Sequence, residues 1–309
     1  MEYENHSIDP TSLESWVISK CDQWRDHYES NYKEKFDEYY RLWRGQWAYE
    51  DTLRTSERSR IISPALQQAV ESAVAEVEEA TFGRGKWFDI QDDIQDTNNL
   101  DIAKMRKTLD EDFKFVAARK AIAECVLNAA VFGTGVAEIV ADEEIELTPS
   151  TQPVMEGGMQ AVGVLERSRT VFKVRPVMPQ NFLIDPVATS IKEALGVAID
   201  EYVPIHQVHL AQEAGIYRQV SVENASIDID LEPDQDLTQY TDDKVRLTKY
   251  YGKVPRNLFE GDSDEGETVE GSSEYVEAII VVANNGTLLK AEQNPYMMQD
   301  RPVVAFPWD

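Results

Sequence analysis

The chain has 309 residues, long enough for about two domains, and 42% of them are hydrophobic, which excludes global disorder. Its 57 acidic side chains outnumber 30 basic ones, for a formal net charge of -27. This balance argues against tight, sequence-specific binding of DNA or RNA, because such binding needs clustered Lys and Arg against phosphates.

The first predicted element is a long helix over about residues 10–49. Thr11 and Ser12 are candidate N-caps, with Glu14 and Ser15 in the first turn. Aromatic or apolar side chains recur mostly every three or four positions: Trp16, Cys21, Trp24, Tyr28, Tyr32, Phe36, Tyr39, Trp43 and Trp47. We expect this stripe to pack in a core or an interface. Stacking on single-stranded nucleic acid is the alternative, although nearly as many acids as bases flank the stripe.

A second helix is predicted over residues 64–82, with Ser63 as N-cap, Pro64 at the first helical position and Gly83 as C-cap. A short strand is predicted at 86–90. The intervening GRGK turn lacks the spacing of a phosphate-binding P-loop. It also follows a helix, whose C-terminal end carries negative partial charge that repels phosphate. We therefore interpret the turn as structural.

Residues 98–132 predict two helices or one kinked helix, stopped by Gly133 and Gly135. A strand over 135–147, a loop or hairpin tip over 148–163 and a return strand over 169–177 follow. The remaining predicted elements are a turn-bounded run at 178–188, strands at 195–204 and 245–254, a helix at 205–215 ended by Gly215, a hairpin around a type I′ turn at Asn285-Gly286, and a last strand within 301–309.

This order predicts an α+β fold, with long N-terminal helices followed by a mostly antiparallel β region with short helices. We expect a helical part over residues 1–135 and a β-rich part over 136–309. Residues 223–243 and 260–274 are strongly acidic and are expected to be solvated loops.

Candidate chemical groups are few. Cys21 and Cys125 are expected to be buried free thiols of a reducing compartment. His206 and His209, with Glu213, form a weak zinc-like pattern for which a solvated surface is the better interpretation. From the acidic, polar N-terminal residues and the lack of a long apolar run, we expect neither a signal peptide nor a membrane span.

No catalytic, cofactor or metal site is predicted, and the chain is not expected to be an enzyme. The acids of 228–236 and 262–267 leave open a metal-dependent nuclease or hydrolase as an alternative. The best polar candidates are Arg58 and Arg60, which can pair with acids of the chain itself or reach carboxylates of a neighbouring subunit. Arg84 and Lys86, which are suited to the C-terminal end of the 64–82 helix, are further candidates for a subunit interface.

Three segments, in this order, resemble the portal (head-to-tail connector) proteins of tailed bacteriophages of the podovirus type. They are RSRIISPALQQAVESAVAEVEEATFG at 58–83, ECVLNAAVFGTGVAEI at 124–139, and RPVMPQNFLIDPVATSIKEALGVAIDE at 175–201. Within the third, Pro179, Phe182, Asp185, Pro186 and Ala188 carry the likeness. The resemblance spans roughly residues 40–205 and, more loosely, 301–309.

The resemblance implies a structural protein of the virion, assembled in the host cytoplasm into a ring of about twelve copies at one capsid vertex. Double-stranded DNA would pass through the ring, without sequence-specific binding, during packaging and ejection. Capsid protein, terminase and tail adaptors are the implied partners, with no cofactor and no membrane. The chain would supply the wing, without the stem, clip and crown. Another phage capsid or tail adaptor protein is the remaining alternative.

Overall fold

The α+β class is confirmed by the computed structural model, in which a long N-terminal helix precedes a region of antiparallel sheets. The structure describes residues 12–48, 63–85, 87–90, 99–152, 161–222, 244–259, 274–284, 286–296 and 299–308, with only the backbone described at 99–101, 143–152 and 161–167.

The chain divides into two compact units that do not follow the chain order. The first unit comprises residues 1–42 and 177–302, and the second comprises residues 43–176 and 303–309. The sequence analysis expected a helical part before residue 135 and a β-rich part after it. The two compact units are divided differently, because each of them contains both helices and a sheet.

The first unit opens with the predicted N-terminal helix, which has three parts: α1 (Leu13–Tyr28), a π-helical turn η1 (Glu29–Lys33) and α2 (Glu34–Arg44). Ser12 caps α1 as expected. Its hydroxyl accepts from the Ser15 backbone N–H at 3.4 Å, while the Ser15 hydroxyl accepts from the Ser12 N–H at 3.2 Å. This reciprocal pair satisfies two backbone donors at the helix start. The π-helical turn was not predicted.

The sheet of the first unit has the strand order β3-β4-β5-β6-β7, and all neighbours are antiparallel. Its strands are β3 (Phe182–Ile184), β4 (Gly196–Pro204), β5 (Lys244–Pro255), β6 (Tyr275–Ala283) and β7 (Thr287–Gln293). The connections contain η2 (Pro179–Asn181), α7 (Ile205–Glu213) and α8 (Arg256–Phe259). The strands predicted at 195–204 and 245–254 and the helix at 205–215 are thus confirmed.

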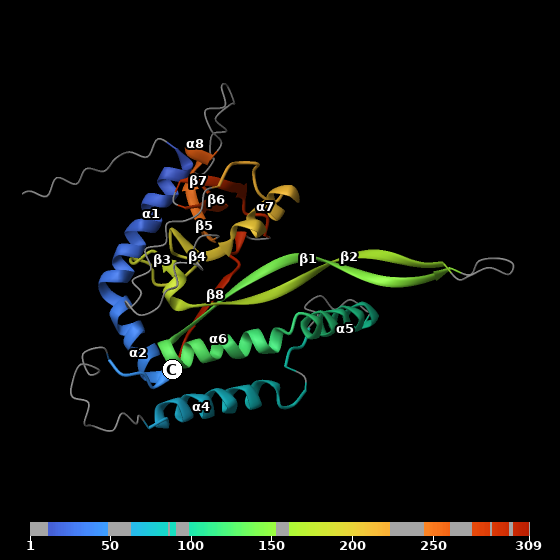
Figure 1. Cartoon of the computed structure of the whole chain (residues 1–309), viewed down its shortest axis with the longest axis horizontal. Coiled ribbons are helices and arrows are strands. Elements are labelled where there is room, and N and C mark those ends of the chain that lie inside the picture. The colour runs from blue at the N-terminus through green and yellow to red at the C-terminus, as the bar shows by residue number, and fades with distance from the viewer. Residues whose placement is uncertain are drawn as a thin grey trace, which may run out of the picture. The chain divides into compact units, whose positions relative to one another are not determined.

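Both faces of this sheet are covered, by α1 on one side and α7 on the other (Figure 1). On β5, Tyr250 and Val254 face α1, whereas Val245 and Leu247 belong to the core under α7. Successive strand residues point to opposite faces, so a strand covered on both sides is apolar at nearly every position. This explains the continuous apolar run of β6.

The β6–β7 hairpin is confirmed, but its turn lies one residue earlier than predicted. Ala283 pairs with Thr287, and the Gly286 N–H donates to the Ala283 carbonyl at 3.1 Å. The turn therefore starts at Asn284, which has a φ of 47°. Asn284 also accepts from the Arg246 N–H through its side chain at 3.0 Å and donates to the Arg246 carbonyl at 2.9 Å. These two bonds to β5 select the earlier turn.

Gly252 of β5 sits opposite Gly196 of β4, where the backbones approach closely. A Cβ at Gly252 would meet the Gly196 Cα atom, and the Leu195 carbonyl oxygen at 2.6 Å. We expect Gly252→Ala to lower the free energy of unfolding by about 1–3 kcal/mol, because the neighbouring atoms belong to the backbone and cannot move aside without disturbing the sheet. Gly286→Ala is the control, since the nearest atom to its Cβ is 4.0 Å away. Equal urea midpoints for the two variants would contradict this account.

The second unit contains α4 (Ala65–Phe82), α5 (Asn99–Phe115) and α6 (Ala118–Phe132) with the sheet order β2-β1-β8. Its strands are β1 (Thr134–Gln152), β2 (Ala161–Val177) and β8 (Val303–Pro307). Helix α6 lies beside α4, and β1 and β2 form a long ribbon (Figure 1). Strand β8 pairs antiparallel with the start of β1, from Thr134↔Pro307 to Glu138↔Val303.

Several boundaries differ from the sequence prediction. Helix α4 begins at Ala65 with Pro64 at the cap position and no side-chain cap, so Ser63 is not the N-cap. Ala117, with a φ of 51°, separates α5 from α6, which gives two helices. Gly133 ends α6 in the left-handed conformation as expected.

Two predicted loop and strand segments are corrected as well. Gly135 lies inside β1 and does not stop a helix, and the strands extend into the predicted loop as far as 152 and from 161. Residues 87–90 are not a strand, because Trp87 and Phe88 pack side by side with other rings and do not alternate between two faces.

Candidate functional site

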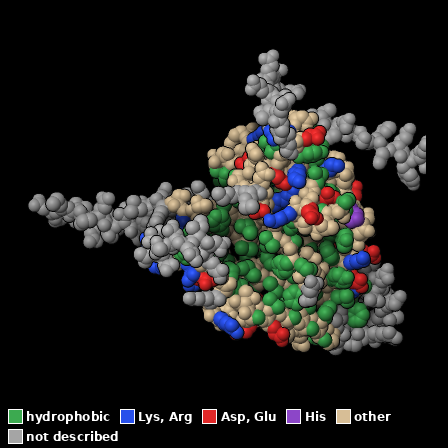
Figure 2. Space-filling view, turned by 180° about the vertical axis from the view of Figure 1, so that it is seen from behind, with side chains coloured by type: hydrophobic (Ala, Val, Ile, Leu, Met, Phe, Trp, Pro, Cys, Tyr) green, Lys and Arg blue, Asp and Glu red, His purple; other side chains and the backbone are tan. Residues whose placement is uncertain are grey.

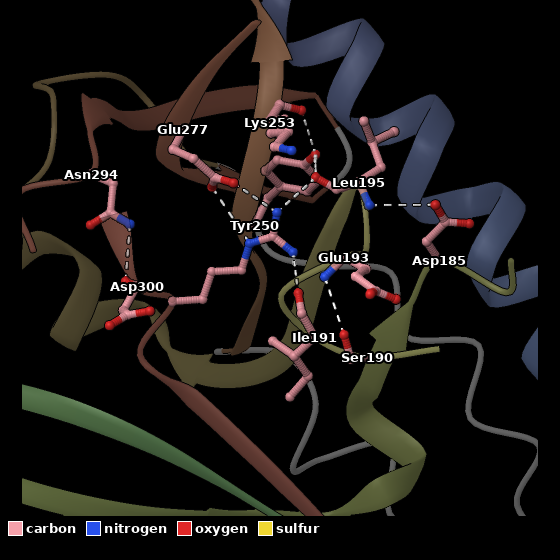
Figure 3. Close-up of polar contacts among 11 residues, drawn as sticks. Asp185, Ser190, Ile191, Glu193, Leu195, Tyr250, Lys253, Glu277, Asn294 and Asp300 are labelled. Carbon is pink, nitrogen blue, oxygen red and sulfur yellow. Dashed lines mark hydrogen bonds and ion pairs between the residues drawn. The ribbon is translucent and has the colours of Figure 1, made fainter. Parts of the chain in front are cut away.

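A polar cluster of the first unit surrounds Arg301, whose side chain is 4% exposed. Figure 3 labels its partners Ile191, Leu195 and Glu277. Its guanidinium donates to the carbonyls of Ile191 at 2.5 Å and Leu195 at 3.2 Å, and pairs with Glu277 at 2.8 Å. Tyr250 donates to the Lys253 carbonyl at 2.9 Å next to it. The donors of this cluster are used within the fold, so we interpret it as structural.

Asp185 organises the segment that precedes β4. Its carboxylate accepts from the Val187 N–H at 3.2 Å and from the Leu195 N–H at 3.5 Å (Figure 3). The Asp-Pro pair of the third sequence segment therefore closes a turn and does not present a reactive carboxylate.

The four predicted interface residues are only partly described. Arg84 is exposed, directly after the C-cap of α4. Arg58, Arg60 and Lys86 lie outside the described residues. The structure therefore does not bring the four together, and their interface role stays a prediction.

Two adjoining hollows in the second unit form the strongest candidate site. Their volumes are about 340 and 360 Å³. Both are lined by Gly85, Trp87, Asp110 and Lys114. The first adds Phe88, Ala103, Arg106 and Lys107, and the second adds Phe82, Phe113, Ala117 and Arg119. We call these residues together the aromatic–basic pocket.

Aromatic rings build one part of this pocket. The Trp87 ring lies 5.5 Å from Phe82, 5.1 Å from Phe88 and 5.0 Å from Phe113, measured between ring centroids. Phe88 and Phe113 also meet edge to face at 5.1 Å. Trp87 and Phe88 are only half-buried, so the cluster keeps aromatic surface open to a ligand.

Basic side chains build the other part. Lys114 pairs with Asp110 at 2.6 Å, and Arg106 pairs with Asp89 and donates to the Ile90 carbonyl at 3.1 Å. The Arg119 guanidinium lies 5.1 Å from the centre of the Phe82 ring. Among the described residues, four cations and the carboxylate of Asp110 line the pocket, in a chain of net charge -27. Three of the cations have a carboxylate partner: Arg106 pairs with Asp89, Lys107 with Glu111 and Lys114 with Asp110.

The N-terminus of α6 opens beside the second hollow. Its N-cap, Ala117, has no side-chain cap bond, and Ala117 and Arg119 both line the hollow. The first N–H groups of a helix lack intrahelical partners, and that end carries positive partial charge. The C-terminal ends of α4 and α5, with Phe82 and Lys114, line the same hollow, and their negative partial charge opposes that of the α6 N-terminus, so the cationic side chains set the positive character of the pocket.

Other reactive groups are buried or scattered. Cys21 and Cys125 are free and buried, as predicted. Burial, reinforced by Glu124, raises the pKa of Cys125 to about 11, which does not favour a nucleophilic thiolate. Asp112 pairs with Arg169, and Glu138 approaches Arg175 at 3.5 Å, so these buried carboxylates have basic neighbours on β2.

Metal sites are absent from the described part of the chain, where no group of three His, Cys, Asp or Glu side chains is placed to hold an ion. His209 instead contacts the Gln212 side chain at 3.2 Å on α7. The acidic runs 228–236 and 262–267 lie outside the described residues.

Sequence reasoning missed the pocket, although α5 carried a signal for it. Ala103, Arg106, Lys107, Asp110 and Lys114 are spaced so that they share one helix face. Such a stripe is normally apolar when it packs on a core, and its basic character could have marked a site.

Comparison with known proteins does not assign the chain to a family: no family model matches it, and no curated protein is significantly similar. Within the residues that the structure describes, every helix is too short or too polar to cross a bilayer.

Proposed function

We propose that this chain is the wing part of a phage portal protein. It works as a structural subunit of a ring of about twelve copies at a capsid vertex, and it catalyses no reaction. Double-stranded DNA passes through this ring during packaging and ejection, while terminase and tail adaptors dock on it.

The observation that carries the proposal is apolar surface left uncovered on regular elements. Of the described side chains of α4, Val74 and Phe82 are buried, while Leu66 is 48% exposed and Val77 is also exposed. Figure 2 shows hydrophobic side chains exposed at the surface in the view drawn. Apolar surface of this kind is typical of a subunit that associates with other copies or partners.

The local structures of the three resembling segments support the same proposal. The described part of the first segment is α4, the second is the end of α6 with its glycine cap leading into β1, and the third is the Asp185 turn leading into β4. These segments therefore contain a helix, a helix stop and a turn, which is compatible with the proposal.

The direct test is the mass and symmetry of the purified chain, measured by native mass spectrometry and electron microscopy. We expect a ring of about twelve copies. A chain that stays monomeric at all concentrations, and also in the presence of capsid protein, would refute the proposal.

Charge reversal at Arg58 and Arg60 together, R58E with R60E, is expected to reduce ring yield at least several-fold while leaving the thermal unfolding midpoint nearly unchanged. The physical reason is that paired arginines facing carboxylates of a neighbour become repulsive when reversed. The matched control reverses two exposed lysines of the first unit, Lys192 and Lys253. Equal ring yields for both double variants would contradict the interface role.

A further inference from the structure

We propose that the aromatic–basic pocket binds a nucleotide unit, that is, a planar base joined through its sugar to a phosphate. This inference rests on the described residues of the second unit and is independent of the proposed ring. It assigns a ligand to a site in a chain whose overall charge disfavours nucleic acid.

The size of the pocket suits a small ligand. The hollow of about 340 Å³ and its neighbour of about 360 Å³ lie within the range of small-molecule sites. The aromatic ring of Trp87 and the basic side chain of Lys114 line both hollows. A ligand with a flat ring at one end and an anionic group at the other can therefore contact both side chains.

The base is held by the half-buried rings of Trp87 and Phe88. Every nucleobase has a π-face, and stacking on aromatic side chains is the usual way in which proteins hold unpaired bases. The contacts of Trp87 with Phe82 and Phe113 fix its ring in place, so stacking on it does not require the indole to be ordered first.

The phosphate is held by the side chains of Lys114 and Arg119, which line the same hollow. An ammonium has three N–H donors, and the Lys114–Asp110 bond at 2.6 Å uses one of them.

Asp110 favours a nucleotide over an acidic peptide, the other polyanion that basic residues attract. A carboxylate in the wall repels acidic side chains, whereas it accepts hydrogen bonds from base N–H groups or sugar hydroxyls. A ligand with donors at one end and an anion at the other therefore fits this wall better than a uniformly acidic one.

The test is calorimetric titration of the full chain with AMP, GMP, adenosine and inorganic phosphate. We expect a nucleoside monophosphate to bind at least tenfold tighter than adenosine or phosphate alone. The double variant Lys114→Gln with Arg119→Gln should weaken nucleotide binding at least tenfold, whereas the control Lys192→Gln with Lys253→Gln should not change it. Phosphate binding as tightly as nucleotide, or an unchanged affinity in the pocket variant, would overturn the proposal.

One further variant and two further ligands test whether the pocket prefers a nucleotide. Lys107→Gln changes a side chain that is 80% exposed and is therefore compatible with folding, and it should weaken binding about threefold. A hexaglutamate peptide that binds tighter than AMP would overturn the nucleotide assignment. If a 5′-phosphorylated oligothymidylate binds tighter than the mononucleotide, the natural ligand is the end of a DNA strand. If the mononucleotide binds tighter, the natural ligand is a free nucleotide. Both results support a nucleotide site in this pocket.

Discussion

Replacing Trp24 by alanine is expected to lower the free energy of unfolding by about 3–5 kcal/mol. The Trp24 side chain is 5% exposed and stacks on Tyr250, with ring centroids 5.9 Å apart and an interplanar angle of 18°. Its loss would leave a cavity between α1 and β5, and Trp16, which meets Tyr250 edge to face at 6.1 Å, would lose part of its support. Urea unfolding followed by far-UV circular dichroism measures the effect.

The control is Tyr39→Ala, on the same aromatic stripe. Tyr39 is 43% exposed, so its removal should cost less than about 1 kcal/mol. This pair separates the two halves of the stripe, because α1 packs in the core while the described side chains of α2 are not buried. Equal losses for the two variants would show that the whole stripe is buried.

Arg301→Met is expected to destabilise the first unit by about 3–5 kcal/mol. The change removes the partner of Glu277, whose side chain is only 11% exposed, and leaves the Ile191 carbonyl without this donor. The Leu195 carbonyl also loses Arg301 but still accepts from the Lys253 N–H at 2.8 Å. A charge that is buried without a partner loses its hydration and gains nothing in return. The shift in the guanidinium chloride midpoint, at constant slope, measures this effect.

Two companion variants test the cause. Lys192→Met breaks the pair with Asp300, in which the lysine side chain is 84% exposed, and should cost at most about 1 kcal/mol. Combining Arg301→Met with Glu277→Leu should recover most of the loss, because the unpaired carboxylate is gone. A double variant as unstable as the single one would locate the effect in the carbonyl contacts alone.

The elements that could be predicted from the sequence are those set by local patterns. Alternation and apolar runs predicted β4, β5 and the β6–β7 hairpin, and the Ser12 cap and Gly133 stop predicted helix ends. Each of these signals depends on residues within a few positions of one another, so a single sequence contains it in full.

The features that could not be predicted depend on contacts between distant residues. The Asn284 turn is set by two bonds to Arg246, and the pairing of β8 with β1 joins residues more than 150 positions apart. Likewise, the predicted strand at 86–90 was wrong because Trp87 and Phe88 pack with Phe113 of α5. The sequence of residues 86–90 alone gives no indication that these rings contact Phe113.

The candidate site shows the same division. Sequence reasoning singled out the Gly-Arg-Gly-Lys turn and rejected a P-loop there, because the turn follows a helix. It could not bring Arg106, Lys114 and Arg119 beside the ring of Trp87, since these cations come from two later helices. Gly85 of that turn nevertheless lines both hollows.

The late position of β8 has a consequence during translation. About 125 residues separate β8 from β2, so at about 5–20 residues per second its synthesis follows theirs by roughly 6–25 s. Until then the Thr134–Glu138 edge of β1 exposes unpaired backbone groups to any extended segment nearby. During this interval we expect the nascent chain to be most prone to wrong strand pairing at this edge.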